Sequence, residues 1–214
     1  MSSAPSDLLP DLRASITGLV HDPRNDRVAR TVRRAGFRGR PAGIVAARTP
    51  EDVAFAVRVA RLHDRPVVVS SSSLRMPASV SGAVLLLTSG LRGVEIDPGA
   101  RIARVQAGAR WSDVLAEAAG YGLSPFPEDL VPGDGSVVRS LGFADVAGFE
   151  VVTSEGRFLQ VDAASDADLF WALAGGSGAA AIVTEVRLRV SAGSGDRWDE
   201  ALRVWSAGAE LASA

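Results

Sequence analysis

The sequence contains no cysteine and no lysine, and each absence removes a class of chemistry. Without cysteine, the chain can form no disulfide, no thiolate nucleophile and no cysteine-based metal site. All 23 basic residues are arginine, so a Schiff base on lysine and a phosphate-binding loop that needs lysine are both excluded. Two histidines, His21 and His63, are too few for a histidine-rich zinc site, and we expect no metal.

Charge and hydropathy exclude further classes of protein. The 214 residues carry a net charge of −2, which argues against a general nucleic-acid or membrane-surface binder. No apolar run approaches the roughly 18 residues that a membrane span needs. The first residues, MSSAPSDLLPDLR, lack the pattern of a signal peptide. With 47% hydrophobic and 22% charged residues, we expect a globular, cytoplasmic protein.

The first part of the sequence alternates short apolar strands with amphipathic helices. Surface helices are expected in 11–35. AGIVAA (42–47) and RPVVVS (65–70) have the pattern of buried strands. The segment between them begins with Thr49 as a helix cap and Pro50 at the first helical position. This strand–helix–strand order predicts parallel strands.

The pattern changes after residue 80. AVLLLTSG predicts a further strand, and two hairpins are predicted to turn at 97–99 and 154–156. Helices are predicted in WSDVLAEAAGYG, capped by Ser112, and in SDADLFWALAGGSG, before a long strand in AAAIVTEVRLRVS. We therefore expect one α+β domain over 1–214. It has a small α/β subdomain (11–80), a larger, mostly antiparallel subdomain (81–190) and a C-terminal tail (191–214).

Four phrases also carry a family resemblance. They are RPAGIVAARTPEDVAFAVRVARLHDRPVVV, LRGVEIDPGARIARVQAGARWSDVLAEAAGYGL, GFEVVTSEGRFLQVDAASDADLFWALAGGSG and IVTEVRLRV. In this order they resemble the FAD-binding domain of the vanillyl-alcohol-oxidase or p-cresol-methylhydroxylase (PCMH) type, in particular the berberine-bridge-like oxidases of bacteria. The resemblance implies a PCMH-type fold with FAD laid between two subdomains. It also implies a substrate domain, which is expected to be missing because the chain stops at Ala214.

The departures from the family fall where it holds flavin. The family's first loop reads like Arg-Gly-Gly-Gly-His, and the position that often tethers the flavin is here Leu74. A side chain at a position of positive φ costs on the order of 1 kcal/mol, so serine should weaken such a loop. The residues interpreted as vestigial loop are Ser70, Ser71, Ser72, Ser73, Gly175, Gly176, Ser177 and Gly178. We therefore expect no cofactor, with non-covalently bound FAD as the alternative.

A cleft without flavin remains a preformed site for a small molecule. Its predicted ligand-binding residues are Ser72, Ser73, Arg75, Trp111, Arg139 and Ser177. Arg75 and Arg139 suit a carboxylate or enolate oxygen. The candidate catalytic residues are Asp129, Asp134 and Arg139, with Glu128 as a further carboxylate for general-base work. The competing interpretation is a solvated loop for these residues, and core or helix-end packing for Trp111 and Tyr121.

Three functions remain open on these observations. The first is a cofactor-free descendant of a flavin oxidase whose cleft promotes a non-redox cyclisation in a bacterial natural-product pathway. The second is an FAD-dependent oxidoreductase, and the third is a non-catalytic binding or scaffold protein. Exposed apolar surface on the face of the missing domain predicts a homodimer that uses Trp198, Leu202 and Trp205.

Overall fold

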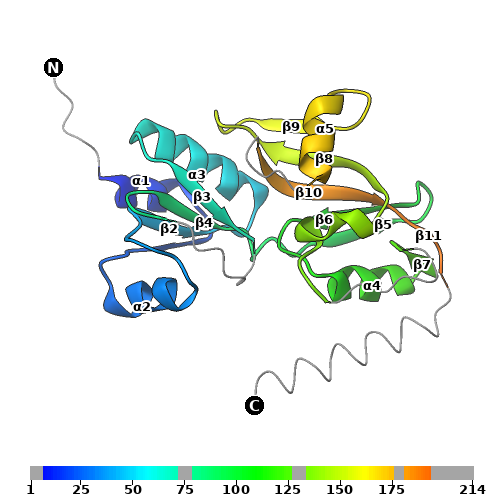
Figure 1. Cartoon of the computed structure of the whole chain (residues 1–214), viewed down its shortest axis with the longest axis horizontal. Helices are drawn as coiled ribbons and strands as arrows, with labels where there is room; N and C mark the ends of the chain where they lie inside the picture. Colours follow the sequence, from blue (N-terminus) through cyan, green and yellow to red (C-terminus); the bar gives the residue numbers. More distant parts are fainter. Residues whose placement is uncertain (1–6, 72–78, 127–133, 176–180, 194–214) are drawn as a thin grey trace, which may run out of the picture. The chain divides into compact units, whose positions relative to one another are not determined.

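The computed structural model describes residues 7–71, 79–126, 134–175 and 181–193 (Figure 1). The chain folds as two compact units. The first comprises Met1–Leu91 together with Val152–Leu159, and the second comprises Arg92–Val151 together with Gln160–Ala214.

A four-stranded sheet forms the centre of the first unit. Its order is β1 (Leu19–His21), β2 (Gly43–Ala46), β4 (Val84–Leu87) and β3 (Val67–Ser70). Strands β2, β4 and β3 are parallel, as the strand–helix–strand order predicts, and β1 is antiparallel to β2. Strand β4, which the sequence pattern groups with the second subdomain, lies between β2 and β3 and therefore belongs here.

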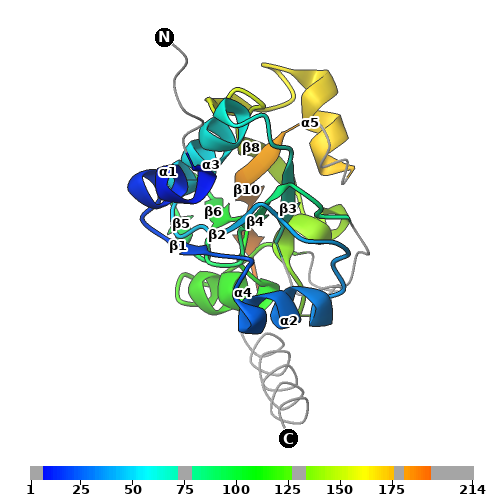
Figure 2. The same cartoon turned by 90° about the vertical axis from the view of Figure 1, so that its left-hand side faces the viewer.

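Helices cover both faces of this sheet. Helices α1 (Leu8–Ser15) and α3 (Pro50–Leu62) lie on one face, and α2 (Asp26–Arg34) lies on the other (Figure 2). Helix α2 packs Val32 against Ile44 and Leu85 of the sheet. Helix α3 begins as the sequence predicts, because the Thr49 side chain accepts the N–H of Asp52 and Pro50 occupies the first turn.

The second unit is built on a five-stranded sheet. Its order is β5 (Val94–Asp97), β6 (Ile102–Gln106), β10 (Ile182–Arg189), β8 (Val146–Val152) and β9 (Phe158–Val161). Strand β6 is antiparallel to both of its neighbours, and the hairpins β5–β6 and β8–β9 turn where the sequence predicts. The tip of the β8–β9 hairpin is the part counted with the first unit. There the guanidinium of Arg58 donates to the Gly156 carbonyl over 2.9 Å.

One layer of helices completes the core of the second unit. Helix α4 (Trp111–Ala119) buries Trp111, Val114 and Leu115, and helix α5 (Ala167–Ala174) buries Phe170 and Leu173. Two 3₁₀ turns, η1 (Val137–Arg139) and η2 (Leu141–Phe143), and a short pair of strands, β7 (Leu123–Ser124) and β11 (Ser191–Ala192), complete the described part of the unit.

The cap predicted for α4 is wrong. The residue that precedes the helix is Arg110, and Ser112 lies inside the first turn. The longest helix in the described ranges is α3 with 13 residues, so none of them reaches the length of about 20 that crosses a bilayer.

Candidate functional site

The carboxyl ends of three parallel strands meet at one edge of the sheet in the first unit. Strands β2, β4 and β3 end at Ala46, Leu87 and Ser70, which lie in register with one another. In open α/β sheets, ligands bind in the crevice outside the carboxyl ends of the strands. This edge, hereafter the carboxyl edge, is therefore the first place to look for a ligand.

Thr88 follows β4 at the carboxyl edge and carries an incomplete set of hydrogen bonds. Its N–H donates to the Ser70 carbonyl over 3.0 Å, which continues the pairing of β4 with β3. The residue is 1% exposed, and its Oγ1 atom has no hydrogen-bond partner among the residues that the structure describes. A buried hydroxyl without a partner costs about 1–3 kcal/mol. The position therefore fits a ligand that brings its own donor or acceptor.

The backbone packs closely at the same edge. A Cβ on Gly90 would lie 2.5 Å from the carbonyl oxygen of Ala47, the residue that follows β2. Only glycine permits this approach of the segment after β4 to the segment after β2. The close packing therefore fixes the segment that carries Thr88.

Asp52 holds together the start of α3, which directly follows this edge. Its carboxylate accepts the N–H groups of Thr17, Gly18 and Arg48 at 2.7–3.0 Å, and that of Thr49 at 3.4 Å. Burial alone raises the pKa of Asp52, but these hydrogen bonds, first those from Arg48 and Thr17, outweigh it and lower the pKa. The N–H groups of this turn are thus already occupied, and we assign Asp52 a structural role.

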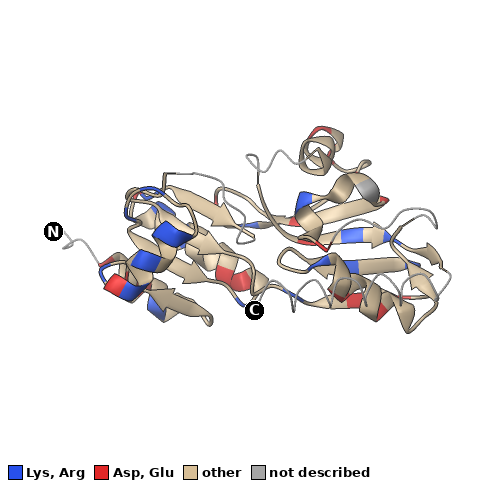
Figure 3. Cartoon of the chain, turned by 60° about the horizontal axis from the view of Figure 1, so that its bottom comes forward, with Lys and Arg blue, Asp and Glu red and all other residues tan. Residues whose placement is uncertain are grey.

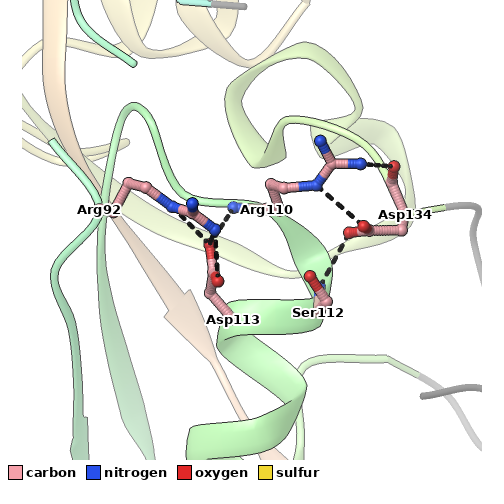
Figure 4. A network of polar contacts seen from close by, with 5 residues as sticks. All are labelled: Arg92, Arg110, Ser112, Asp113 and Asp134. Carbon is pink, nitrogen blue, oxygen red and sulfur yellow. Dashed lines mark hydrogen bonds and ion pairs between the residues drawn. The ribbon is translucent and has the colours of Figure 1, made fainter. Parts of the chain in front are cut away.

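In the second unit, two arginine–aspartate pairs surround the start of α4 (Figure 4). Arg92 Nη2 contacts both carboxylate oxygens of Asp113 at 2.7 and 2.8 Å. Arg110 Nε contacts Asp134 at 2.8 Å, and the second oxygen of Asp134 accepts the N–H of Ser112 over 3.2 Å. Asp134, a candidate general base by sequence, therefore connects the segment before η1 to the start of α4, and both of its carboxylate oxygens are engaged.

Trp111 belongs to the core of the second unit. It is fully buried and meets Phe126 edge-on, with ring centroids 4.5 Å apart. Its Nε1 donates to Ser140 Oγ over 2.8 Å, and that hydroxyl donates to the Ser136 carbonyl. The packing interpretation of Trp111 thus describes the residue better than a place on a binding rim.

Ser136 is the counterpart of Thr88 in the second unit. It is 9% exposed, and its buried Oγ has no hydrogen-bond partner within the described ranges. It directly precedes η1. Sequence reasoning named neither residue. The available signal for Thr88 was its position directly after a buried strand, which it shares with Ser70.

Several residues predicted for the site occupy other positions. Ser70 ends β3, and Ser71 follows it. Arg139 is exposed at the end of η1, Gly175 follows the last residue of α5, and Tyr121 is 52% exposed. The other members of the predicted set lie outside the described residues: Ser72, Ser73, Leu74, Arg75, Glu128, Asp129, Gly176, Ser177 and Gly178.

The argument that serine side chains weaken the cofactor loop does not hold for Ser70 and Ser71. It applies only to residues with positive φ, and the non-glycine residues with positive φ in the described ranges are Asp64 and Arg101. Ser70 and Ser71 therefore adopt backbone conformations that cost serine nothing. With the buried hydroxyl of Thr88, this donor set of serine and threonine at the carboxyl edge fits the phosphate and hydroxyl groups of a dinucleotide.

Comparisons with known proteins agree with this chemistry. The profile of the family described as "FAD binding domain" matches residues 41–162. The chain is 30% identical over 184 residues to the FAD-dependent monooxygenase tpcD of Cochliobolus heterostrophus, which covers 77% of this chain and 34% of that protein. It is 27% identical over 177 residues to the FAD-linked oxidoreductase easE of Trichophyton verrucosum, covering 70% of this chain and 29% of that protein.

A solved structure shares the fold. 6-Hydroxy-D-nicotine oxidase from Arthrobacter nicotinovorans superimposes with a TM-score of 0.64 at 21% identity, over 89% of this chain and 44% of that one. Compared with the curated relatives it matches, the chain spans about a third of their length.

These matches overturn the expectation of a cofactor-free protein. The family profile covers more than half of the chain, and the matched relatives are named for their dependence on FAD. The cyclisation proposed from the sequence relied on the loss of FAD, and nothing in the described structure supports it. The chain belongs to the family of FAD-binding domains of the vanillyl-alcohol-oxidase and berberine-bridge-like type.

Proposed function

We propose that this chain is the FAD-binding part of a flavin-dependent oxidoreductase that oxidises a small organic substrate. The observation that carries the proposal is the buried, unpartnered hydroxyl of Thr88 at the carboxyl edge. Family membership supports the same cofactor. When bound, FAD supplies the two-electron acceptor that such an enzyme needs.

The described residues that would hold the cofactor lie at the carboxyl edge of the first unit. In the first unit, Thr88 and the serines that end β3 supply hydroxyl groups to phosphate or ribose oxygens. The contact of Thr88 would supply the hydrogen bond that its buried Oγ1 lacks among the described residues, and would therefore favour the bound state.

We further propose that FAD is held without a covalent bond. The chain has no cysteine, and its two histidines lie at the other end of the sheet. His21 pairs with Ile44 near the start of β2, and His63 follows α3, where the chain has returned to the start of β3. His63 Nε2 also contacts Asp11 Oδ2 at 2.8 Å.

The test is a titration of the purified chain with FAD, followed by desalting and measurement of the visible flavin absorbance. We expect retained flavin that acid precipitation releases entirely into the supernatant. Thr88→Val should weaken FAD binding by about tenfold, which corresponds to one lost hydrogen bond of about 1.4 kcal/mol. Thr184→Val, which removes another buried threonine hydroxyl, is the control and should bind FAD normally. A wild-type chain that retains no flavin would refute the proposal.

The homodimer expected from the sequence stays a proposal. Trp198, Leu202 and Trp205 lie outside the described residues. Light scattering of the purified chain should give twice the mass of 22.2 kDa, and a monomer at all concentrations would contradict it.

A further inference from the structure

A second concave surface lies in the first unit, away from the carboxyl edge. It is a pocket of about 820 Å³ between α2 and residues 36–41, the segment that leads into β2. Four arginines line it: Arg24, Arg33, Arg38 and Arg40. Because it lies where β2 begins, it is at the opposite end of the parallel strands from Thr88.

The pocket concentrates positive charge in an otherwise acidic chain. Residues 22–40 contain seven arginines and two aspartates, whereas the whole chain has a net charge of −2. Figure 3 shows the arginines of α2 as blue bands along that helix. The guanidinium groups of Arg24, Arg33, Arg38 and Arg40 form no hydrogen bond or ion pair with any residue that the structure describes. The single acid in the lining is Asp26.

The backbone beneath these arginines is fixed. The Arg38 carbonyl accepts the N–H of Val80 over 2.8 Å, and the Arg40 carbonyl accepts the N–H of Gly82 over 2.9 Å. The Asn25 side chain caps α2, and Val32 anchors the helix to the sheet. The arginines therefore project from a preorganised frame, which reduces the entropy cost of binding a ligand.

The lining also contains an apolar part. Val32 is 8% exposed, and Phe37, half-buried, packs against the same cluster as Val32. Pro23, Ala29 and Pro41 complete the apolar lining. A ligand that fits this pocket combines several anionic oxygens with a small organic part.

We propose that this pocket binds a small organic phosphate, carrying a monophosphate or diphosphate group, at a site separate from that of FAD. Guanidinium groups present paired N–H donors that match phosphate oxygens, and several of them suit a group with multiple negative charges. The pocket is large enough for a small molecule. The organic part of the ligand would contact Phe37 and Val32.

The experiment is isothermal titration of the FAD-saturated full chain with inorganic pyrophosphate at 0.15 M salt. Saturation with FAD prevents pyrophosphate from binding at the cofactor site. The test variant is Arg33→Gln/Arg38→Gln, which removes two guanidiniums from the pocket lining. The matched control is Arg27→Gln/Arg30→Gln, which removes the same charge from the same helix outside the lining.

We expect the wild type and the control to bind pyrophosphate with similar affinity, because Arg27 and Arg30 are outside the pocket lining and would donate no hydrogen bond to the bound phosphate. The test variant should bind at least about tenfold more weakly and should retain its flavin absorbance. Absence of binding to the wild type would overturn the proposal. An equal loss of pyrophosphate affinity in the test variant and the control would also overturn it. So would a single-stranded oligonucleotide that binds more tightly than pyrophosphate and loses the same affinity in both variants. Either result would show a diffuse basic surface that binds polyanions.

Discussion

The polar groups at the two ends of the parallel strands in the first unit differ in burial and in hydrogen bonding. At the carboxyl edge, Thr88 and Asp52 are almost completely buried. The Asp52 carboxylate accepts hydrogen bonds from backbone N–H groups, whereas the Thr88 hydroxyl has no partner among the described residues. At the amino end, the arginines around α2 are exposed and unpaired. The free energy of a polar group depends strongly on burial. Substitutions at the carboxyl edge should therefore change stability, whereas those at the amino end should change only ligand binding.

The largest effect is expected for Asp52→Asn. The amide would place a donor among the N–H groups of Thr17, Gly18 and Arg48, and the free energy of unfolding at pH 7 should fall by about 3 kcal/mol. Asp26→Asn, at an exposed position on the first turn of α2, is the control and should change it by less than about 0.5 kcal/mol. Urea denaturation measures both. Equal free energies of unfolding in the two variants would contradict the expected difference between the carboxyl edge and the amino end of the parallel strands.

The effect of Asp52 should also depend on pH. Its pKa is lower in the folded chain than the ordinary value of 3.8, so the contribution is fully present above that value and is lost as pH falls through the folded pKa. The difference in unfolding free energy between wild type and Asp52→Asn should therefore shrink below about pH 4. A difference that stays constant from pH 7 to pH 3 would show that the carboxylate charge is unimportant.

Gly90→Ala should have the next largest effect. The new Cβ would lie 2.5 Å from the Ala47 carbonyl, and we expect a loss of about 1–3 kcal/mol of unfolding free energy through displaced backbone. Gly142→Ala is the matched control, because its Cβ would meet no atom within 4 Å. Thermal unfolding of both variants decides the point, and equal melting temperatures would contradict the close packing at this edge.

Thr88→Val is expected to change the free energy of unfolding by a smaller amount and to raise it, whereas the preceding substitutions lower it. The substitution removes a buried hydroxyl that has no partner, so without FAD the chain should keep its stability or gain up to about 1 kcal/mol. Thr184 Oγ1 donates to the Glu150 carbonyl over 3.1 Å, and Thr184→Val should therefore lose about 1 kcal/mol. A loss at Thr88 as large as that at Thr184 would indicate that the Thr88 hydroxyl stabilises the fold by itself.

The smallest effect is expected at the amino end. Arg33→Gln/Arg38→Gln should change the free energy of unfolding by less than about 0.5 kcal/mol per substitution, since both side chains are exposed. Denaturation in urea gives the value, and a loss above 2 kcal/mol would show that these arginines support the fold.

Much of the fold follows from patterns within single segments. Thr49 and Pro50 predict the start of α3, and Ser154–Gly156 predict a hairpin turn, because caps and turns depend on a few neighbouring residues. The cap of α4 was predicted incorrectly. Asp134 accepts the N–H of Ser112 from more than twenty residues away, and such a partner leaves no local signal.

The sequence by itself determined most of the longer helices and strands, the family and the absence of cysteine and lysine chemistry, because these depend on residue identity and local order. The tertiary structure alone decided that β4 lies between β2 and β3, that Thr88 and Ser136 are buried without partners, and that four arginines share one pocket. Burial and hydrogen-bond satisfaction depend on segments distant in the chain. The serines at the end of β3 consequently gave a wrong prediction about the cofactor when they were considered without their backbone conformation.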